Sequence, residues 1–576
     1  MLKPFFKKHG WKYGPGAALL VLCAWLGTCS PRLLGEAIDL IGGGDWTAFW
    51  HRVLLMVLVG AAIFITRNGW RFFIIVNSRE LEIMLRNQYY DHIQKLPVEF
   101  FNHTRTGDLM AYAINDVNAV RMTCGAGFAQ LLNGISSLVF SVSAMAAGVN
   151  PRLTLLSLLP VPLAVLAILL ISKQIRIRFR RVQELFALLS AHVQENIMGM
   201  RVLKAFAQEK PQKADFENEC DTMRAANVRL NDASALLTPV IELIFGASFV
   251  IGMVYGGSLV LSGTISLGDY VAFNSYLVMI KVPVVSLGRI MNLFQRGLAS
   301  YKRLNSVMSE PEIPEFERIA ETPADHRPIE GRIEARHLTF TYSDGTRPAL
   351  EDVSFTVPQG GVLGIVGATG SGKSTILHLL TKTSMAERGS LFVDGRDIRD
   401  IPAVTLREAI GYVPQDGFLF DTTLEENIRF FSNCDDDTLN AAVRVSGLEK
   451  DIDSLPDGLN TMCGERGNHL SGGQRQRAAL ARALVRQPKI LLLDDTLSAV
   501  DTKTEVFILE QLKDAFKGRT VIIISHRLSA VQHADEILCM DEGRVAEHGT
   551  HEALLEKNGI YARFWKEQQK EASRHE

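Results

Sequence analysis

The sequence is poor in the residues that build redox and metal centres. Its seven cysteines are scattered through 576 residues, without a CxxC pair and without a cluster of histidines. This pattern excludes a disulfide framework and a structural zinc site, and it is typical of separate, reduced thiols. Charge of one sign is also lacking, since the formal net charge is −2. We therefore expect no nucleic-acid partner, because such partners attract strongly basic proteins.

The N-terminus lacks the cleavage site of a secretory signal. Residues 1–12 are basic and lead into an apolar stretch, but no small-residue cleavage pattern follows, and more apolar segments come later. We interpret this segment as the cytoplasmic flank of a helix that is retained in the protein.

Long apolar runs, by contrast, are abundant in the first half of the chain. A membrane-spanning helix needs about 20 mostly apolar residues, and beyond the last such run the pattern becomes that of a soluble α/β domain. The chain is also too long for a single hydrophobic core. The six candidate spans lie at roughly residues 15–41, 52–76, 125–148, 152–173, 235–261 and 268–292.

The connections between these spans are alternately short turns and long basic loops. The long loops, residues 77–124 and 174–234, carry several arginines, including a cluster at 176–181. Because positive residues favour the cytoplasmic side, we expect both termini and both long loops in the cytoplasm. Helical periodicity in the loops predicts helices that continue beyond the membrane. Pro97 and Gly107 indicate a break with room for a short transverse helix.

Four ionisable residues, Arg67, Arg71, Glu242 and Lys281, fall inside the candidate spans. Charges inside a membrane are costly and usually face a bundle interior or a water-filled cavity. These residues could form a polar wall of a substrate cavity. They could instead form an internal Arg–Glu pair or reach the headgroups without touching substrate. The sequence leaves both interpretations open.

An acidic, proline-rich stretch separates the two halves of the chain. Residues 310–329 contain four prolines among several glutamates. Proline removes a backbone donor and disfavours helix at the preceding residue. We therefore predict a transmembrane domain at 1–309, a linker at 310–329 and a soluble domain at 330–576, with its first strand beginning near Ile333.

The second half contains a phosphate-binding loop between a strand and a helix, which is the context such a loop requires. Glycines let backbone amides approach phosphates, and the N-terminus of the helix favours negative charge. We expect Lys373 to reach the β- and γ-phosphates of a bound nucleotide and Ser374 to bind Mg²⁺. The residues predicted to hold the nucleotide in this loop are Gly367, Gly370, Gly372, Lys373, Ser374 and Thr375.

Further motifs follow the loop in a recognisable order. They include Gln415 after an apolar strand, the run Leu-Ser-Gly-Gly-Gln at 470–474, the paired Asp494 and Asp495 after four apolar residues, and His526. Together with the six spans, these motifs resemble an ATP-binding cassette (ABC) half-transporter of the exporter type, over essentially the whole chain. The resemblance implies a multidomain protein in which an all-α six-helix transmembrane domain is followed by an α/β P-loop ATP-binding cassette.

The resemblance also implies a role for each motif. Tyr342 would stack on adenine, residues 498–501 would form the D-loop, and Asp494 and Gln415 would join Ser374 near Mg²⁺. Asp495, His526 and Gln415 make up the expected catalytic set. In this family two cassettes pack head to tail, so the chain needs a second half-transporter in the lipid bilayer of a bacterial cytoplasmic (inner) membrane. The residues that would bind the partner's ATP are Ser471, Gly472, Gly473 and Gln474.

One residue departs from the family pattern, because Asp495 stands where glutamate is usual. Aspartate is one carbon shorter, about 1.5 Å at full extension, and a misplacement of about 1 Å can lower a rate about 100-fold. We therefore predict that this chain's own site binds ATP but hydrolyses it slowly. The chain would then be the degenerate-site subunit of a heterodimeric multidrug exporter, although retention of His526 is compatible with residual activity.

The expected function is ATP-driven export of amphipathic, drug-like or lipid-like small molecules, with hydrolysis mainly at the partner-based site. Three alternatives stay open: a siderophore-type importer of the same fold, a homodimer with two slow sites, and an ATP-gated channel or regulator. The sequence does not identify the substrate.

Overall fold

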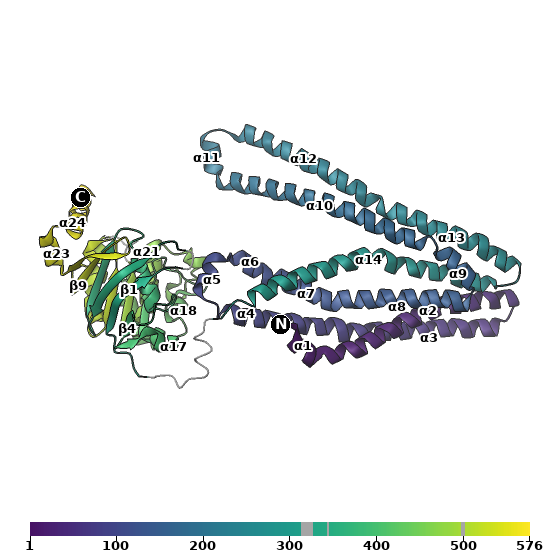
Figure 1. Cartoon of the computed structure of the whole chain (residues 1–576), viewed down its shortest axis with the longest axis horizontal. Helices are drawn as coiled ribbons and strands as arrows, with labels where there is room; N and C mark the ends of the chain where they lie inside the picture. Colours follow the sequence, from purple (N-terminus) through teal and green to yellow (C-terminus); the bar gives the residue numbers. More distant parts are fainter. Residues whose placement is uncertain (313–326, 343–344, 497–501, 576) are drawn as a thin grey trace. The chain divides into compact units, whose positions relative to one another are not determined.

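The structure, a computed structural model, describes residues 1–312, 327–342, 345–496 and 502–575 (Figure 1). Most of the predicted linker and the predicted D-loop lie outside these residues, so the domain boundaries stay predictions. The chain forms two compact units, each described by itself below. Unit 1 comprises Met1–Gln94 and Thr104–Pro311, and unit 2 comprises Lys95–His103 and Glu312–Glu576.

Unit 1 is built from helices, and six of its helical runs are long and apolar enough to cross a membrane. The predicted number of spans is thus confirmed. The runs contain 41 to 53 residues, about 60 to 80 Å of helix, whereas a bilayer core is about 30 Å thick. Helices of this length could continue beyond the bilayer core, and that extension stays a prediction. The helices are α1 (Leu2–His9), α2 (Tyr13–Gly43), α3 (Trp46–Arg71), α4 (Asn77–Ile93), α6 (Thr106–Ala111), α7 (Val117–Met122), α8 (Phe128–Gly148), α9 (Pro151–Leu158), α10 (Val161–Met198), α11 (Met200–Ala205), α12 (Glu209–Ala235), α13 (Leu237–Leu261) and α14 (Leu267–Val307).

Local capping explains the three short connections between the long helices. Gly44 ends α2 in the left-handed conformation, and the Asp45 side chain then accepts a hydrogen bond from the first turn of α3. Asn150 caps α9 in the same way. Ser266 and Asp269 form a reciprocal capping box that begins α14. Each turn therefore satisfies the donors at the helix start that follows it.

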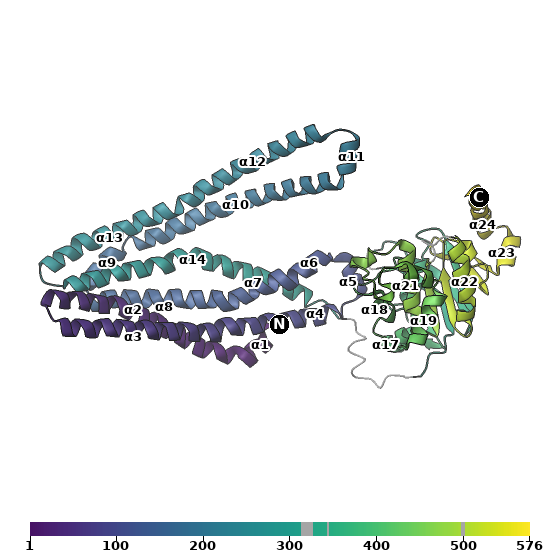
Figure 2. The same cartoon turned by 180° about the vertical axis from the view of Figure 1, so that it is seen from behind.

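The α10–α12 hairpin extends away from the other helices of unit 1. Figures 1 and 2 show α10 and α12 side by side, joined by α11, and diverging from α14 and α8 toward the α11 end. At the other end, α13 packs with α9, α10 and α14 around a buried apolar cluster. The hairpin thus leaves much of its own surface exposed.

The ionisable residues of the spans are not paired as an Arg–Glu pair. Lys281 of α14 donates instead to the carboxylate of Glu242 on α13. Arg67 and Arg71 are exposed, and the Arg71 guanidinium lies 5.9 Å from the centre of the Trp70 ring. The Arg–Glu alternative is therefore wrong for this structure, because Lys281 occupies the position next to Glu242.

Unit 2 is an α/β domain with two sheets. A six-stranded sheet has the order β10-β9-β3-β8-β7-β6, and a four-stranded antiparallel sheet has the order β2-β1-β4-β5. The strand predicted near Ile333 is present as β1, and α5 (Val98–His103) is the short helix predicted after Pro97. The strands are β1 (Ile333–Phe340), β2 (Leu350–Val357), β3 (Val362–Gly367), β4 (Leu391–Val393), β5 (Arg396–Asp397), β6 (Ile410–Val413), β7 (Ile490–Asp494), β8 (Thr520–Ile524), β9 (Glu536–Asp541) and β10 (Arg544–Gly549).

The larger sheet is covered on both faces, and this explains why its central strands are continuously apolar. Alternate residues of β7 point to opposite faces. Leu491 and Leu493 pack into a cluster with α19, α21 and α22, while Ile490 and Leu492 pack toward α16 and the smaller sheet. The helices of unit 2 are α16 (Lys373–Leu380), α17 (Ala403–Ala409), α18 (Leu424–Arg429), α19 (Asp436–Val445), α20 (Glu449–Ser454), α21 (Gly472–Leu484), α22 (Thr502–Phe516), α23 (His551–Lys557) and α24 (Ile560–His575).

Candidate ATP site

Four neighbouring parallel strands bring most of the predicted site residues to one edge of the larger sheet. β3, β8, β7 and β6 are adjacent and parallel. The P-loop follows β3, His526 follows β8, Asp494 ends β7, and Gln415 follows β6. Because the carboxyl ends of parallel strands share an edge, residues far apart in the sequence meet there, as is usual for ligand sites in α/β sheets.

The P-loop has a backbone path that only glycine fits. Gly370 and Gly372 have φ of +82° and +93°, a region that residues with a Cβ rarely adopt. A Cβ on Gly372 would also lie 2.3 Å from the Ala349 carbonyl oxygen. The Lys373 Nζ donates to the carbonyl oxygens of Gly367 at 3.0 Å and Ala368 at 2.8 Å. The Lys373 side chain is thus held by the P-loop itself, where it is predicted to bind phosphates.

Ser374 and Asp494 come together at the start of α16 and the end of β7. The Ser374 hydroxyl donates to Asp494 Oδ1 at 3.0 Å. Burial raises the pKa of the Asp494 carboxyl, and the hydrogen bond from Ser374 opposes this shift. Burial lowers the pKa of Lys373, opposed by the charges of Asp494 and Asp495. Each charged group is therefore buried beside a compensating partner.

This oxygen pair fits Mg²⁺. The ion prefers oxygen ligands and is usually held by one or two protein groups together with phosphates and water. Within the described ranges, no three His, Cys, Asp or Glu side chains gather to hold a metal ion by themselves. Ser374 and Asp494 would accordingly share Mg²⁺ with a bound nucleotide.

Asp495 forms hydrogen bonds with residues at and just after the end of β8. It is buried and has φ of +44°. Its backbone N–H donates to the Ile524 carbonyl at 2.8 Å, and its carboxylate Oδ1 accepts from the His526 backbone N–H at 3.4 Å. The His526 side chain is exposed. The two predicted catalytic residues therefore meet through the Asp495 side chain and the His526 backbone.

Tyr342 contacts the first turns of α16. Its hydroxyl donates to the Thr375 hydroxyl at 3.2 Å, and His378 Nδ1 lies 3.2 Å from the same oxygen. Burial lowers the pKa of His378, which favours the neutral ring. Because the single proton of the Tyr342 hydroxyl goes to Thr375, Nδ1–H of that ring would donate to the Tyr342 oxygen. Sequence reasoning did not find His378, because nothing in the local pattern connects it with a tyrosine 36 positions earlier.

The signature segment is a well-formed helix start. Ser471 caps α21, accepting from the Gln474 N–H at 3.2 Å, and the Gln474 side chain accepts from the Ser471 N–H at 2.9 Å. Gly472 and Gly473 form the first turn. Asp451 accepts from Gln474 and from Arg477, and so fixes the helix start from outside. This role of Asp451 could not be predicted from the sequence, because no local motif connects it with segment 470–474.

Two predicted groups stand apart from the others. Between the described P-loop and segment 470–474, no hydrogen bond is formed within this chain. The Gln415 side chain is exposed, and its carbonyl accepts from Gln476 at 3.5 Å. Gln415 thus lies at the correct sheet edge without a contact to Ser374 or Asp494 in the described hydrogen bonds.

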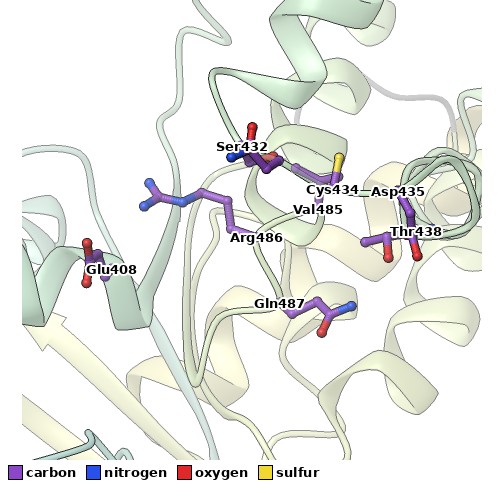
Figure 3. Close-up of a pocket in the computed structure, with 9 residues that line it drawn as sticks. Glu408, Ser432, Cys434, Asp435, Thr438, Val485, Arg486 and Gln487 are labelled. Atoms are coloured by element: carbon purple, nitrogen blue, oxygen red, sulfur yellow. Dashed lines mark hydrogen bonds between the residues drawn. The ribbon is translucent and has the colours of Figure 1, made fainter.

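A separate cavity of about 510 Å³ lies at the other end of α21 (Figure 3). Glu408, Asp435 and Arg486 are among its lining residues. None of the predicted ATP-site residues lines it among the described side chains. The P-loop edge of the sheet is therefore the better candidate for nucleotide chemistry.

Comparisons with known proteins agree with this geometry. Residues 16–284 match the family model described as ABC transporter transmembrane region, and residues 350–498 match the model described as ABC transporter. The chain is 38% identical to the probable multidrug resistance ABC transporter ATP-binding/permease protein YheI of Bacillus subtilis (strain 168), covering 98% of this chain and 96% of that protein. It is 33% identical to the multidrug resistance-like ATP-binding protein MdlA of Escherichia coli (strain K12), covering 99% and 96%.

A lipid-handling relative and a solved structure extend the match. The ATP-dependent lipid A-core flippase of Syntrophus aciditrophicus (strain SB) is 32% identical over 88% of this chain and 84% of that protein. The structure of a bacterial Atm1-family ABC exporter with ATP bound matches with a TM-score of 0.77 and 27% identity, covering 98% of this chain and 99% of that one. A transmembrane region and an ATPase domain thus occur once each in one chain. The chain belongs to the ABC transporters and is an exporter half-transporter that binds ATP.

Proposed function

We propose that this chain is the catalytically weaker half of a heterodimeric exporter of amphipathic, drug-like or lipid-like compounds. The observation that carries the proposal is Asp495, a shortened carboxylate that is buried and bonded to the His526 backbone. A group that positions water must reach the γ-phosphate. Asp495 falls short of the usual glutamate by about 1.5 Å, so hydrolysis would occur mainly at the site built on the partner's P-loop.

The rest of the site supports binding of ATP. The P-loop, Ser374 and Asp494 have the geometry expected for holding phosphates and Mg²⁺, which would neutralise charge on the β- and γ-phosphates when bound. Tyr342 lies against α16, next to Thr375. This chain would therefore hold ATP in its own site while Ser471, Gly473 and the N-terminus of α21 serve the partner's ATP.

Exposed apolar residues on the α10–α12 hairpin support the need for a partner. α10 contains 38 residues, about 57 Å, so its C-terminal half extends outside a bilayer core of about 30 Å. Phe186, Ile197, Met198, Val202 and Phe206 are exposed in this region. Apolar surface outside both lipid and core is typical of a protein–protein contact. A second half-transporter would cover it.

The proposed membrane orientation follows from charge. Lys7, Lys8, Arg79 and the arginines at 176–181 flank the cytoplasmic ends of the spans. Both termini and the ATPase unit would lie in the cytoplasm of a bacterium. Relatives named for multidrug resistance and for lipid A-core flipping support a substrate that is partly apolar and enters from the membrane.

The asymmetry can be tested in the purified pair. Replacing the partner's catalytic carboxylate by its amide should lower the ATPase rate at least about 100-fold, while Asp495→Asn should change it less than about twofold. The measurement is steady-state, vanadate-sensitive phosphate release. A near-normal rate after the partner substitution would disprove the asymmetric model. A stable, ATP-hydrolysing dimer of this chain alone would instead favour the homodimer.

A further inference from the structure

The loop that carries His526 is held by a buried carboxylate of α22. Glu505 is buried, and it accepts hydrogen bonds from the Arg527 guanidinium and from the Ser529 hydroxyl. The His526 side chain, just after β8, is exposed, and β8 pairs with β3, the strand that leads into the P-loop. The backbone of the loop is thus fixed while the imidazole stays accessible at the P-loop edge of the sheet.

Gln568 of α24 binds the same loop from a second helix. Its side-chain N–H donates to the His526 carbonyl oxygen at 2.6 Å, and its side-chain oxygen accepts from the Leu528 N–H at 2.9 Å. One planar amide therefore bridges two backbone groups that lie two residues apart. A reversed amide would place donor against donor and acceptor against acceptor, so both contacts require the same orientation.

The start of α24 is anchored away from Gln568. The Glu547 carboxylate accepts from the backbone N–H groups of Ile560 and Tyr561, at 2.7 and 3.0 Å. These are donors that a helix start leaves without a partner inside the helix. Glu547 therefore fixes the first turn of α24 without any contribution from Gln568.

Apolar packing holds the next turns of α24. Tyr561 is fully buried, and Phe564 and Trp565 pack against the same apolar cluster. These three residues and Gln568 follow the i, i+3, i+4, i+7 spacing of one helix face. The apolar side chains therefore hold the helix, and the last position of this face presents an amide to the loop of His526.

We infer that Gln568 is a positioning residue for His526, through which the C-terminal helix α24 controls binding of the γ-phosphate at this chain's own site. The inference rests on the proposed role of His526 in that site. An imidazole N–H donates to a phosphate oxygen, and such a hydrogen bond weakens steeply when its angle is lost. Gln568 binds the carbonyl of His526 itself, so it fixes the backbone from which the imidazole projects.

The experiment compares two nucleotides in the full pair of half-transporters. AMP-PNP has a γ-phosphate and is not hydrolysed, whereas ADP lacks the γ-phosphate. The partner's P-loop lysine is replaced, so that binding is measured at this chain's own site. Gln568→Met removes both hydrogen bonds but keeps an unbranched side chain that favours helix. It should weaken AMP-PNP binding about fivefold and leave ADP binding within about twofold.

The matched control is Gln569→Met. Gln569 is the next residue of α24, is exposed and makes no hydrogen bond among the described residues, so this variant should bind both nucleotides within about twofold of wild type. Gln568→Glu keeps the acceptor for Leu528 but has no donor for the His526 carbonyl, and it should show the same selective loss as Gln568→Met. Equal losses of AMP-PNP and ADP affinity in both Gln568 variants would show that Gln568 only supports the fold, and would overturn the inference.

A double variant tests whether Gln568 acts through His526. His526→Ala should weaken AMP-PNP binding about tenfold. Adding Gln568→Met should weaken it no further, because the imidazole that Gln568 positions is gone. Additive losses, or no loss in His526→Ala, would overturn the inference.

The proposed export function is judged by a different measurement, the steady-state ATPase rate of the intact pair. A near-normal rate after substitution of the partner's catalytic carboxylate would overturn the asymmetric model. That result would leave the binding data on Gln568 and His526 unaffected, so the two failures are distinguishable.

Discussion

The signature segment and the Asp495 region are both expected to act on ATP, yet they are built differently. The signature is complete, with Ser471 and Gln474 capping each other and Asp451 fixing the helix start. Asp495 is shortened, buried and bonded to backbone. In the proposed heterodimer, the complete part would serve the partner's nucleotide, and the shortened part would serve this chain's own. On that proposal the chain would contribute more to the partner's site than to its own.

The largest expected effect comes from the signature. Gly473→Asp places a carboxylate in the first turn of α21, where acidic residues stabilise a helix, so the fold should persist. The same carboxylate would repel the γ-phosphate of the ATP on the partner. It would also disrupt the hydrogen-bond donors at the N-terminus of α21, and loss of such a donor lowers a rate about 100-fold or more. We expect vanadate-sensitive ATPase of the pair to fall at least about 100-fold.

Asp495→Asn in the same complex is the matched comparison for that substitution. It alters the carboxylate of this chain's own site without touching α21. Equal losses from Gly473→Asp and Asp495→Asn would break the comparison, because they would show that both sites carry turnover.

A smaller effect is expected from restoring the missing methylene. In a pair whose partner-based site is silenced by an amide at the catalytic carboxylate, Asp495→Glu should raise the residual ATPase about tenfold, as the carboxylate gains reach toward the γ-phosphate. Single-turnover hydrolysis of bound ATP is the measurement. Asp495→Asn in the same silenced pair should show no gain. An unchanged rate of ATP hydrolysis in Asp495→Glu would mean that other residues of this site limit hydrolysis.

Most residues of the two regions compared above can be predicted from the sequence, because the motifs that contain them are local. The P-loop, the signature and the paired aspartates are each defined by a short run, and continuous apolar strands predict a buried parallel sheet that brings them to one edge. The six spans are equally local, since length and hydropathy suffice. Such features need no knowledge of distant contacts.

The remaining features depend on contacts across long sequence separations. Asp451 supports the signature from another helix, and His378 meets Tyr342 across 36 positions. The pairing of Glu242 with Lys281, in place of an arginine, depends on how α13 packs against α14. Side chains of these types occur throughout soluble and membrane proteins, so their partners cannot be assigned before the fold is known.

The smallest expected effect concerns ATP binding at this chain's own site, which is proposed to bind ATP although it hydrolyses ATP slowly. His378→Leu removes the donor beside the Tyr342 oxygen, and loss of one such hydrogen bond is worth about 1 kcal/mol, or about fivefold in affinity. We therefore expect ATP to bind about fivefold more weakly at this chain's own site, measured by titration of the pair with the partner's P-loop lysine replaced. His378→Gln, which keeps an N–H donor, should restore most of the affinity. Tripolyphosphate, which has no adenine, should bind His378→Leu and wild type equally.

Tyr342→Phe breaks the same hydrogen bond. The double variant should therefore bind ATP no more weakly than either single variant. Additive losses of ATP affinity would show that His378 supports the P-loop helix and not Tyr342.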